Sequence, residues 1–359
     1  VALAVAGSNP VIHPIHPLAS MARSAPAKTS RSAAAKVLLA GLALPCGLAV
    51  LELGIRLFRP EYDPSGHLKL EAATPVRPAL GRAGTVQWHI KNTGAFAVPV
   101  RFNQYGFRDR RDLRDSNPAD IAVVGDSFSF GWGVNEEERF SDRLEELIGV
   151  HVFNIAMPGA RLADYGRLLD YAERTGLRAK RLVVGICMEN DLAPAPAIAG
   201  AAAAPPSPLL GVHAWLKSRS AAYFLLLCRV HQNASWSDRL ARWGWITPVL
   251  EGVPRAVGRP DVIRSSAEQL EGLVRNHDAT ILIIPSRALW VGDDRDAADR
   301  MHRDWVATLR EKNLPVVDLR MAMEESGNPM GFHFRGDGHW NARGHALAAR
   351  SLSEFLSAK

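Results

Sequence analysis

Five residues near the ends of apolar, β-branched runs have the types that acyl transfer at neutral pH requires. They are Ser127, Gly159, Asn190, Asp337 and His339. This chemistry needs a nucleophile, a base, an acid that orients the base, and hydrogen-bond donors for the developing oxyanion. A serine, a histidine and an aspartate meet the first three needs, and a glycine N–H and an asparagine amide meet the last. These residues can act together only if the fold brings the ends of the runs to one place.

The candidate nucleophile lies in IAVVGDSFSFGWG, residues 121–133. A buried strand that ends in Gly-Asp-Ser presents the hydroxyl of Ser127 at its carboxyl end, where parallel sheets bind their substrates. Ser or Asp at the start of a helix is also a common N-cap, so the tripeptide alone does not decide its role. We expect the aromatic residues that follow, Phe128, Phe130 and Trp132, to be core packing beside the pocket.

The candidate base and acid lie in HFRGDGHWNARGH near the C-terminal end of the sequence. Asp337 can accept the Nδ1 proton of His339, which leaves Nε2 free for the serine hydroxyl. Alternatively, the segment is an exposed loop in which Asn341 caps the last helix. A metal site that combines this pair with His333 and His345 is disfavoured, because the spacing is irregular and no carboxylate cluster accompanies it. We expect no metal and no cofactor.

Two further residues are candidate donors to an oxyanion. Gly159, in NIAMPGA, could bring a backbone N–H close to substrate because it has no side chain, or it could be an ordinary turn glycine. Asn190, in ICMENDL, could donate from its amide or could cap a turn. The backbone N–H of Ser127, at the start of the helix that follows it, is a third candidate.

The residues from 119 onward alternate between strand-like and helix-like segments. Continuous apolar runs of this length are typical of parallel strands that are buried on both faces, and amphipathic segments separate them. Connection rules then predict a three-layer α/β/α sandwich around a parallel sheet of five strands. The expected strands lie in residues 119–127, 151–156, 181–186, 280–286 and 315–319, and the expected helices in 135–148, 163–176, 261–277, 296–312 and 342–356.

The ordered set Ser127, Gly159, Asn190 and His339 resembles the four motif blocks of the SGNH/GDSL hydrolase superfamily. The resemblance covers about residues 119–359. It implies a flavodoxin-like sandwich in which Ser127 is the nucleophile, His339 the base and Asp337 its orienting acid. It also implies an oxyanion hole made by the N–H groups of Ser127 and Gly159 and by the Asn190 amide.

Two departures from the family pattern accompany this resemblance. The third block usually reads Gly-x-Asn-Asp, whereas here Met188 stands in place of the glycine. The last block usually places Asp three residues before His, whereas here only Gly338 separates them, as in the Asp-x-His pair of related polysaccharide O-acetyltransferases. We assign supporting roles to Asp126 and Asp191, which adjoin Ser127 and Asn190. No GxSxG elbow is present, so the motifs do not support an ordinary α/β-hydrolase.

The N-terminal part of the sequence predicts a membrane anchor. Residues 1–36 are basic without an acid, residues 37–51 carry no charge, and the segment extended to Phe58 is long enough to cross a bilayer. Glu52 and Arg56, four residues apart on one helix face near its far end, are expected to pair. Lys and Arg before the apolar segment predict a cytoplasmic tail and an exported C-terminal domain, periplasmic in a bacterium. The alternatives are a cleaved signal peptide, disfavoured because no small-x-small site follows, and a buried soluble helix. The true start is expected at Met21, or Val1 reflects an alternative start codon.

Two other segments complete the expected organisation. Residues 59–118 are predicted to be a linker with local β structure, including a hairpin in VQWHIKNTGAF. Residues 192–260 interrupt the α/β pattern as an insertion. Within it, residues 193–208 are low in complexity, and 214–230 are expected to form a helix that lies either over the site or on the membrane side.

The charge and the cysteine content exclude two other classes of function. The formal net charge is +6, but the basic tail contributes most of it, so nucleic-acid binding is not expected. The basic stretch 101–115 is expected to be solvated surface. The three cysteines, Cys46, Cys187 and Cys228, form neither a disulfide framework nor a metal-ligand spacing, although a bridge between the last two is possible in an oxidising compartment.

Three functions compete at this stage. The first is a membrane-anchored serine esterase that acts on acyl esters, most plausibly acetyl esters, of a small molecule or a cell-envelope glycan. The second is an O-acyltransferase that forms the same acyl-enzyme and passes the acyl group to a sugar hydroxyl. The third is an inactive binding module, which Met188 favours and the intact Ser127, Asp337 and His339 oppose. The partition between water and another acceptor depends on water exclusion, which sequence does not reveal.

Overall fold

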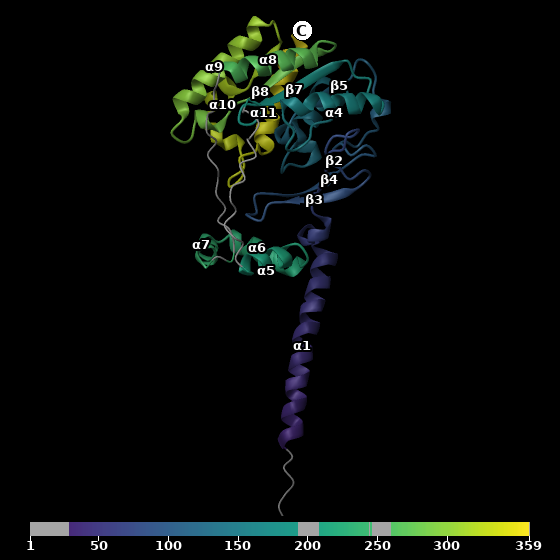
Figure 1. Cartoon of the computed structure of the whole chain (residues 1–359), viewed down its shortest axis with the longest axis vertical. Helices are drawn as coiled ribbons and strands as arrows, with labels where there is room; N and C mark the ends of the chain where they lie inside the picture. Colours follow the sequence, from purple (N-terminus) through teal and green to yellow (C-terminus); the bar gives the residue numbers. More distant parts are fainter. Residues whose placement is uncertain (1–28, 193–207, 244, 246–259, 359) are drawn as a thin grey trace, which may run out of the picture. The chain divides into compact units, whose positions relative to one another are not determined.

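The computed structural model describes residues 29–192, 208–243, 245 and 260–358 (Figure 1). The tail before residue 29, including Met21, and almost all of the low-complexity segment 193–208 lie outside the described residues. The chain separates into two compact units, Val1–Val50 and Leu51–Lys359. The sheet and the candidate site belong to the second unit.

A five-stranded parallel sheet forms the centre of the second unit. Its strands stand in the order β6-β5-β7-β8-β9, so the first strand along the chain pairs with both the second and the third. This is the flavodoxin-like order, which places the switch point of the connections beside β5. The strands are β5 (Ile121–Val124), β6 (Val152–Asn154), β7 (Arg181–Cys187), β8 (Asp278–Ile284) and β9 (Val316–Asp318).

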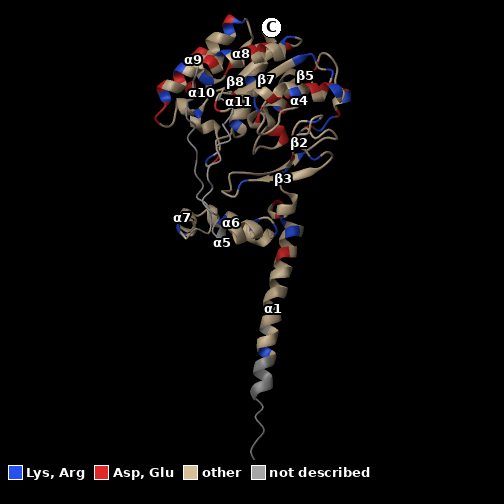
Figure 2. Cartoon of the chain, in the orientation of Figure 1, with Lys and Arg blue, Asp and Glu red and all other residues tan. Residues whose placement is uncertain are grey.

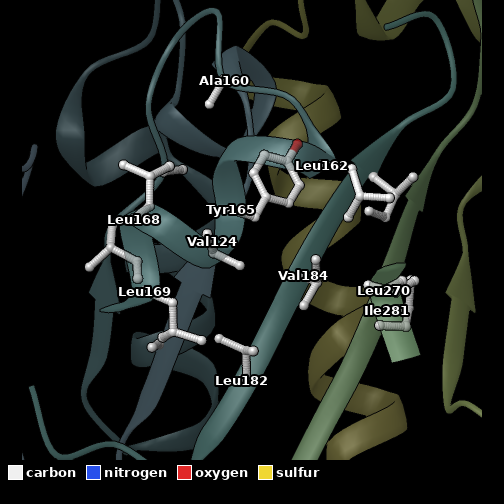
Figure 3. Close-up of a cluster of buried hydrophobic side chains, with 14 of the residues drawn as sticks. Val124, Ala160, Leu162, Tyr165, Leu168, Leu169, Leu182, Val184, Leu270 and Ile281 are labelled. Atoms are coloured by element: carbon white, nitrogen blue, oxygen red, sulfur yellow. The ribbon is translucent and has the colours of Figure 1, made fainter. Parts of the chain in front are cut away.

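Helices cover both faces of this sheet, as the sequence predicted. Alternate residues of each strand face opposite layers: Ala122 and Val124 pack into one apolar cluster, and Ile121 and Val123 into the other. Figure 3 shows part of the first cluster, where side chains of α4 lie over the strands. That layer contains α4 (Leu162–Arg174), α8 (Pro260–Val274) and α9 (Arg295–Glu311), and the opposite layer contains α3 (Phe140–Ile148) and α11 (Ala342–Ser357).

The segment 59–118, expected to be a linker with local β structure, also contributes to the core. A hairpin is present, with its second strand just beyond the predicted segment 86–96: β3 (Val86–Ile90) pairs antiparallel with β4 (Ala97–Arg101). A second pair joins β1 (Leu70–Glu71) to β2 (Leu80–Gly81). The side chains that this segment adds to the core cluster are Leu80, Val100, Phe102, Phe107 and Leu113.

Short helices complete the second unit. Two are α-helices, α2 (Ser127–Phe130) and α10 (Arg320–Glu325). The others are 3-10 turns: η1 (Pro60–Tyr62), η2 (Pro64–Gly66), η3 (Leu113–Asp115), η4 (Glu136–Glu138), η5 (Arg287–Leu289) and η6 (Pro329–Phe332).

The apolar N-terminal segment is a single long helix, α1 (Thr29–Phe58). Residues Ala35–Phe58 have a mean hydropathy of 2.0 and are long and apolar enough to cross a membrane. A signal sequence or an anchor would both have these properties. Near the C-terminal end of α1, Glu52 and Arg56 form the ion pair that their spacing predicted, with 2.7 Å between Oε1 and Nη2.

The insertion contains three described helices, α5 (Pro208–Lys217), α6 (Ala221–His231) and α7 (Ala234–Arg242). The expectation of one helix over 214–230 is wrong, because the helical conformation is interrupted between Lys217 and Ala221. Ser220 caps α6 by accepting a hydrogen bond from the Tyr223 N–H (3.1 Å). Helix starts need such acceptors because their first N–H groups lack partners inside the helix.

The cysteines are free thiols in this structure. Cys187 is buried at the end of β7 and Cys228 is buried in α6, whereas Cys46 is exposed on α1. The bridge between Cys187 and Cys228 that the sequence left open is therefore not formed here.

Candidate active site

Ser127 lies directly after the carboxyl end of β5, as the first residue of the short helix α2. Asp126 precedes it and caps this helix by accepting a hydrogen bond from the backbone N–H of Phe128 (2.9 Å). A side chain at Gly125 would lie 2.3 Å from the hydroxyl oxygen of Ser129, so only glycine fits the turn between strand and helix. The serine hydroxyl is thereby held at the tip of the strand, with the residue 9% exposed.

An unbroken chain of hydrogen bonds connects Ser127 to Asp337 through His339. The distance from His339 Nε2 to Ser127 Oγ is 2.8 Å, and the distance from His339 Nδ1 to Asp337 Oδ1 is 2.5 Å. Because an ionised carboxylate only accepts, Nδ1 carries the proton and Nε2 is left to accept from the serine hydroxyl. The arrangement is that of a nucleophile, a base and an orienting acid.

The loop that carries Asp337 and His339 is a tight turn that accommodates their one-residue separation. The backbone N–H of Phe334 donates to the carbonyl of His339 (2.9 Å), and Gly336 adopts a left-handed φ of 74°. The backbone N–H of His339 also donates to Asp337 Oδ1 (3.2 Å). The acid and the base are therefore oriented by the same turn, although the family usually separates them by two residues.

Two side chains support this loop: Arg287, which follows β8, and Glu189, in the third motif block. The Arg287 guanidinium lies against Gly338, where an added Cβ would come within 2.2 Å of it. Glu189 holds the arginine by accepting from its backbone N–H (2.8 Å), from Nε (3.0 Å) and from Nη2 (2.9 Å). The departure at Met188 leaves a buried side chain in the core, while the next residue, Glu189, connects this block to the catalytic loop.

Lys91, which follows β3, contacts the acid of the site. Its Nζ lies 2.8 Å from Asp337 Oδ2, the carboxylate oxygen that His339 does not use. Burial would raise the pKa of Asp337, but the hydrogen bonds and charges of His339 and Lys91 outweigh it and hold that pKa well below its usual range. No local pattern in the sequence reveals that Lys91 contacts Asp337, because 246 positions separate the two residues.

We expect Lys91→Met to move acid unfolding to higher pH. Asp337 has a folded-state pKa below its unfolded value of about 3.9, so its ionised form stabilises the fold at neutral pH until the pH falls through the folded-state pKa. Without the lysine this pKa rises and the stabilisation is lost earlier, by roughly 0.5–1 pH unit. Near-UV circular dichroism during acid titration measures the midpoint. Lys217→Met, at an exposed lysine, is the matched control, and an unchanged Lys91→Met midpoint would contradict the contact.

Aromatic rings enclose the base on one side. The Trp132 and Phe128 rings lie 5.2 Å and 5.0 Å from the His339 ring, and the His89 ring lies 4.0 Å from that of Trp132. Burial and the nearby charge of Arg108 lower the pKa of His89 to about 3, so this ring is neutral at pH 7. Phe128 and Phe130 are core residues as expected, whereas Trp132 is only partly buried and contacts the candidate base.

Arg108 braces the chain that follows Ser127. The expectation of a solvated basic stretch over 101–115 is wrong at this residue, which is fully buried. Its Nη1 donates to the carbonyls of Phe130 (3.1 Å) and Gly131 (2.6 Å), and its Nη2 to that of Val134 (2.7 Å). Burial and the charge of Arg139 lower the pKa of Arg108 to about 9, so it remains a cation at pH 7.

Arg108→Met is expected to lower the free energy of unfolding by roughly 2–4 kcal/mol, because three buried carbonyls lose their donor. The loop from Phe130 to Val134 would loosen with it. Urea unfolding in detergent solution, followed by fluorescence, gives the difference. Arg110→Met is the control, since that side chain is 56% exposed. Equal effects of the two substitutions would show that the carbonyl contacts of Arg108 do not stabilise the fold.

Asn190 is hydrogen-bonded to Asp126, the residue before the nucleophile. It lies in the turn after β7, and its Nδ2 donates to Asp126 Oδ2 (2.9 Å). Among the described residues, Asp126 is the acceptor for this amide, and Oδ1 is buried without a hydrogen-bond partner there. The structure thus brings Asn190 next to the turn that presents Ser127.

Gly159 lies at the carboxyl end of β6, the strand next to β5. Its φ of 79° is a left-handed conformation that favours glycine, and a Cβ would meet no atom within 4 Å. The neighbouring Met157 donates its backbone N–H to the carbonyl of Gly125 (3.1 Å), which aligns this turn with the one before Ser127. Gly159 also lines a cavity of about 120 Å³, together with Pro158 and other residues.

The two supporting carboxylates lie buried beneath the site. Asp191 accepts hydrogen bonds from the backbone N–H groups of Cys187 (2.8 Å) and Leu162 (2.9 Å) and from the Tyr165 hydroxyl (2.9 Å). It therefore ties the end of β7 to the start of α4. Burial raises the pKa of Asp191, and the charge of Asp126 raises it further; burial also raises the pKa of Asp126, which the Asn190 amide opposes.

His333 and His345, the other two candidate metal ligands in the sequence, have separate environments. His345 is fully buried, and its Nδ1 accepts from the Phe140 N–H (3.3 Å) in the α3 layer. His333 is buried near Trp290, away from the Asp337 carboxylate that His339 and Lys91 contact. Across the described residues, no cluster of three or more His, Cys, Asp or Glu could hold a metal ion.

Comparison with known proteins places the chain in a family. The model of the GDSL-like Lipase/Acylhydrolase family matches residues 123–347, more than half of the chain. A solved lipase/acylhydrolase from Enterococcus faecalis is 13% identical, covers 67% of this chain and 96% of that chain, and has a TM-score of 0.41. A member of the lipolytic protein G-D-S-L family from Veillonella parvula is 14% identical, with coverages of 67% and 99% and a TM-score of 0.40.

A carbohydrate esterase family 2 enzyme with a carbohydrate binding domain, from Corynascus thermopiles, is 13% identical, with coverages of 68% and 67% and a TM-score of 0.35. No curated protein sequence matches the chain. The family match begins within β5, before Ser127, and includes the blocks of Gly159 and Asn190 and the loop of Asp337 and His339. The chain belongs to the GDSL-like lipase/acylhydrolase family, the SGNH ester hydrolases.

Proposed function

We propose that this chain is a membrane-anchored serine esterase that removes acyl groups, chiefly acetyl groups, from a cell-envelope glycan. The observation that carries the proposal is the hydrogen-bond chain from Ser127 Oγ through His339 to Asp337. Membership of the acylhydrolase family supports ester hydrolysis as the reaction. The glycan substrate and the location are the parts that go beyond the family.

The geometry supports a two-step reaction through an acyl-enzyme. Ser127 Oγ attacks the ester carbonyl carbon while its proton passes to His339 Nε2, and Asp337 stabilises the imidazolium that forms. The tetrahedral intermediate collapses, the C–O bond to the alcohol breaks, and the leaving oxygen takes the proton from Nε2. Water then attacks the acyl group, again with His339 as base, and releases the carboxylic acid and free Ser127.

Three donors are proposed for the oxyanion of each tetrahedral intermediate. They are the backbone N–H groups of Ser127 and Gly159 and the second N–H of the Asn190 amide. The bond between Asn190 and Asp126 supports this role, because it fixes the amide beside the nucleophile before substrate binds. Donors that are already oriented need no reorganisation during the reaction, which is why they stabilise charge effectively.

The membrane location rests on the N-terminal segment. The ribbon in Figure 2 has neither the colour of Lys and Arg nor that of Asp and Glu along the middle of α1. In the sequence, Arg23, Lys28, Arg31 and Lys36 precede this stretch without an acid. Such a charge distribution favours a cytoplasmic N-terminus, with the ester hydrolase unit on the extracytoplasmic side. An enzyme held there would face the glycans of the cell envelope.

The test uses the full chain in detergent or nanodiscs. A fluorophosphonate probe should label Ser127, as located by peptide mass spectrometry, and the protein should release acetate from O-acetylated envelope glycan. An oligosaccharide acceptor in the same assay distinguishes a transferase, which would acetylate the acceptor faster than it releases acetate. Lack of both labelling and acetate release would refute the esterase. Release of the mature chain from membranes by alkaline carbonate would refute the anchor.

A further inference from the structure

We infer that helices α5–α7 of the insertion form a docking surface for the anionic surface of the lipid bilayer. This inference rests on the proposed membrane anchor and adds a second, peripheral contact to it. The occupant is the headgroup layer of the leaflet that the apolar end of α1 enters. Three observations carry it: the attachment of α6 to α1, the exposed aromatic and apolar side chains, and the charge of the segment.

The start of α6 is bonded to the last turns of α1. Glu52 accepts hydrogen bonds from the Ser220 hydroxyl (2.9 Å) and from the backbone N–H groups of Ala221 (2.9 Å) and Ala222 (3.0 Å). Arg56 donates to the carbonyl of Arg219 (2.6 Å). Both α1 residues lie within the candidate span Ala35–Phe58, close to its C-terminal end. A span that ends there places the start of α6 at the membrane–water interface.

Apolar packing reinforces this attachment on one side of α6. Phe224 and Cys228 are buried in a small cluster with Ile55 of α1 and with Tyr62, which follows it. Leu226 of the same helix is 59% exposed, so α6 has an inner face that is packed and an outer residue that is not. The inner contacts fix the helix, and the outer side is left for another partner.

The exposed residues of α7 include tryptophans, which are enriched at membrane–water interfaces. Along α7 and its C-cap residue, Trp236, Leu240 and Trp243 recur at intervals of four and three residues, which places them on one helix face. No residue of α7 is buried, and Trp236 and Trp243 are 51% and 68% exposed. An amphipathic helix that buries nothing lacks the packing that normally stabilises it, and tryptophan is the residue that membrane interfaces favour.

The neighbouring helix α5 adds exposed side chains of the same kind. Val212 and Trp215 are 50% and 55% exposed, and none of residues 211–217 is buried. Isolated exposed apolar residues are ordinary on soluble proteins, but here they gather in the short helices on either side of α6, whose start is bonded to Glu52 and Arg56.

The charge of the segment matches an anionic lipid surface. Residues 208–243 contain five Lys or Arg and a single acid, Asp238, so the net charge is +4. Arg219 lies over the ring of Trp215 and Arg239 over that of Trp236, with 5.4 Å to each ring centroid. Each basic side chain near an anionic surface contributes attraction, and paired Trp and Arg present an apolar ring and a cation together.

The experiment reports lipid contact residue by residue in the full chain. A Cys46→Ala background carries one new cysteine, from Trp236→Cys, Trp243→Cys or, as the control, Met321→Cys, labelled with the fluorophore NBD. Met321 is similarly exposed (63%) but lies on α10 of the sheet domain. The proteins are placed in nanodiscs of phosphatidylcholine with or without phosphatidylglycerol, and doxyl-lipid and aqueous iodide serve as quenchers.

Docking predicts blue-shifted NBD emission at positions 236 and 243 and at least twofold stronger quenching by doxyl-lipid than at 321. Charge reversal by Arg239→Glu with Arg242→Glu should weaken this quenching in discs that contain phosphatidylglycerol.

Three outcomes would contradict docking. If the chain co-elutes with the discs while the labels at 236 and 243 are quenched by iodide as strongly as the label at 321, the inference is overturned and the anchor is left intact. Blue-shifted labels that lipid quenchers do not reach would point to a protein partner or a second copy and would also overturn it. Failure to co-elute would overturn anchor and docking together, whereas fluorophosphonate labelling of the same samples tests the esterase separately.

Discussion

Ser127→Ala lowers kcat for p-nitrophenyl acetate by roughly 10⁴- to 10⁶-fold, if Ser127 is the nucleophile. The substitution removes the atom that forms the acyl-enzyme, and only the oxyanion donors and the binding site remain. His339→Ala should lower kcat by a similar factor, because Ser127 without its base cannot attack the ester efficiently. The double variant Ser127→Ala/His339→Ala should lose little more than either single variant, because residues that act as one unit are not additive.

Ser129→Ala is the matched control for this experiment. Ser129 lies in the same short helix, is buried, and its hydroxyl has no hydrogen-bond partner in the described part of the chain. The Asn154 amide donates to its backbone carbonyl (2.8 Å), and that contact survives the substitution. Its kcat should stay within about threefold of the wild type. Retention of more than a tenth of the activity by Ser127→Ala would rule out the proposed nucleophile.

The second large effect is expected for Asp337→Asn, at on the order of 10⁴-fold in kcat. Both oxygens of Asp337 are in use, one by His339 Nδ1 and the other by Lys91 Nζ. An asparagine can offer only one oxygen, and its NH2 group cannot accept a hydrogen bond from either neighbour. Lys91 is always a donor, so the amide oxygen should turn toward it and the NH2 toward Nδ1. His339 would then carry its proton on Nε2, which cannot act as a base for Ser127.

Adding Lys91→Met tests this explanation directly. Without the ammonium, the amide of Asp337→Asn is free to present its oxygen to Nδ1 and restore the productive tautomer. The double variant should therefore recover at least about tenfold of the lost kcat, a gain that a general loss of stability would not produce. Circular dichroism confirms that each variant is folded. If Asp337→Asn is as active as wild type, Asp337 does not orient the base.

The sheet and its helices could be predicted from local sequence alone. Runs such as ILII in β8 are apolar throughout and mostly β-branched, and they indicate a strand buried on both faces. The alternation of such runs with amphipathic segments then leaves few topologies, which is why the three-layer sandwich was predicted correctly. The apolar segment of α1 and the pair of Glu52 with Arg56 are equally local, because they depend only on helix spacing.

The break between α5 and α6 shows where local reasoning fails. AWLKSRSAAYFLLLCRV is helical by propensity from end to end, yet Glu52, far away in the sequence, supplies acceptors for the N–H groups of Ala221 and Ala222. A helix can start only where its first N–H groups find partners, and here the partner comes from tertiary contact.

The sequence by itself determined which residues could do chemistry, since Ser127, Asp337 and His339 lie at strand ends and in a glycine-flanked loop. The tertiary structure decided what surrounds them: Lys91 on the acid, Arg108 under the loop after the nucleophile, and Arg287 against Gly338. Each is a cation distant in sequence from the group it contacts. A charged side chain on a surface and one that completes a site look the same in sequence, because charge carries no periodic pattern that reveals its partner. Burial distinguishes them, and burial is a property of the folded chain.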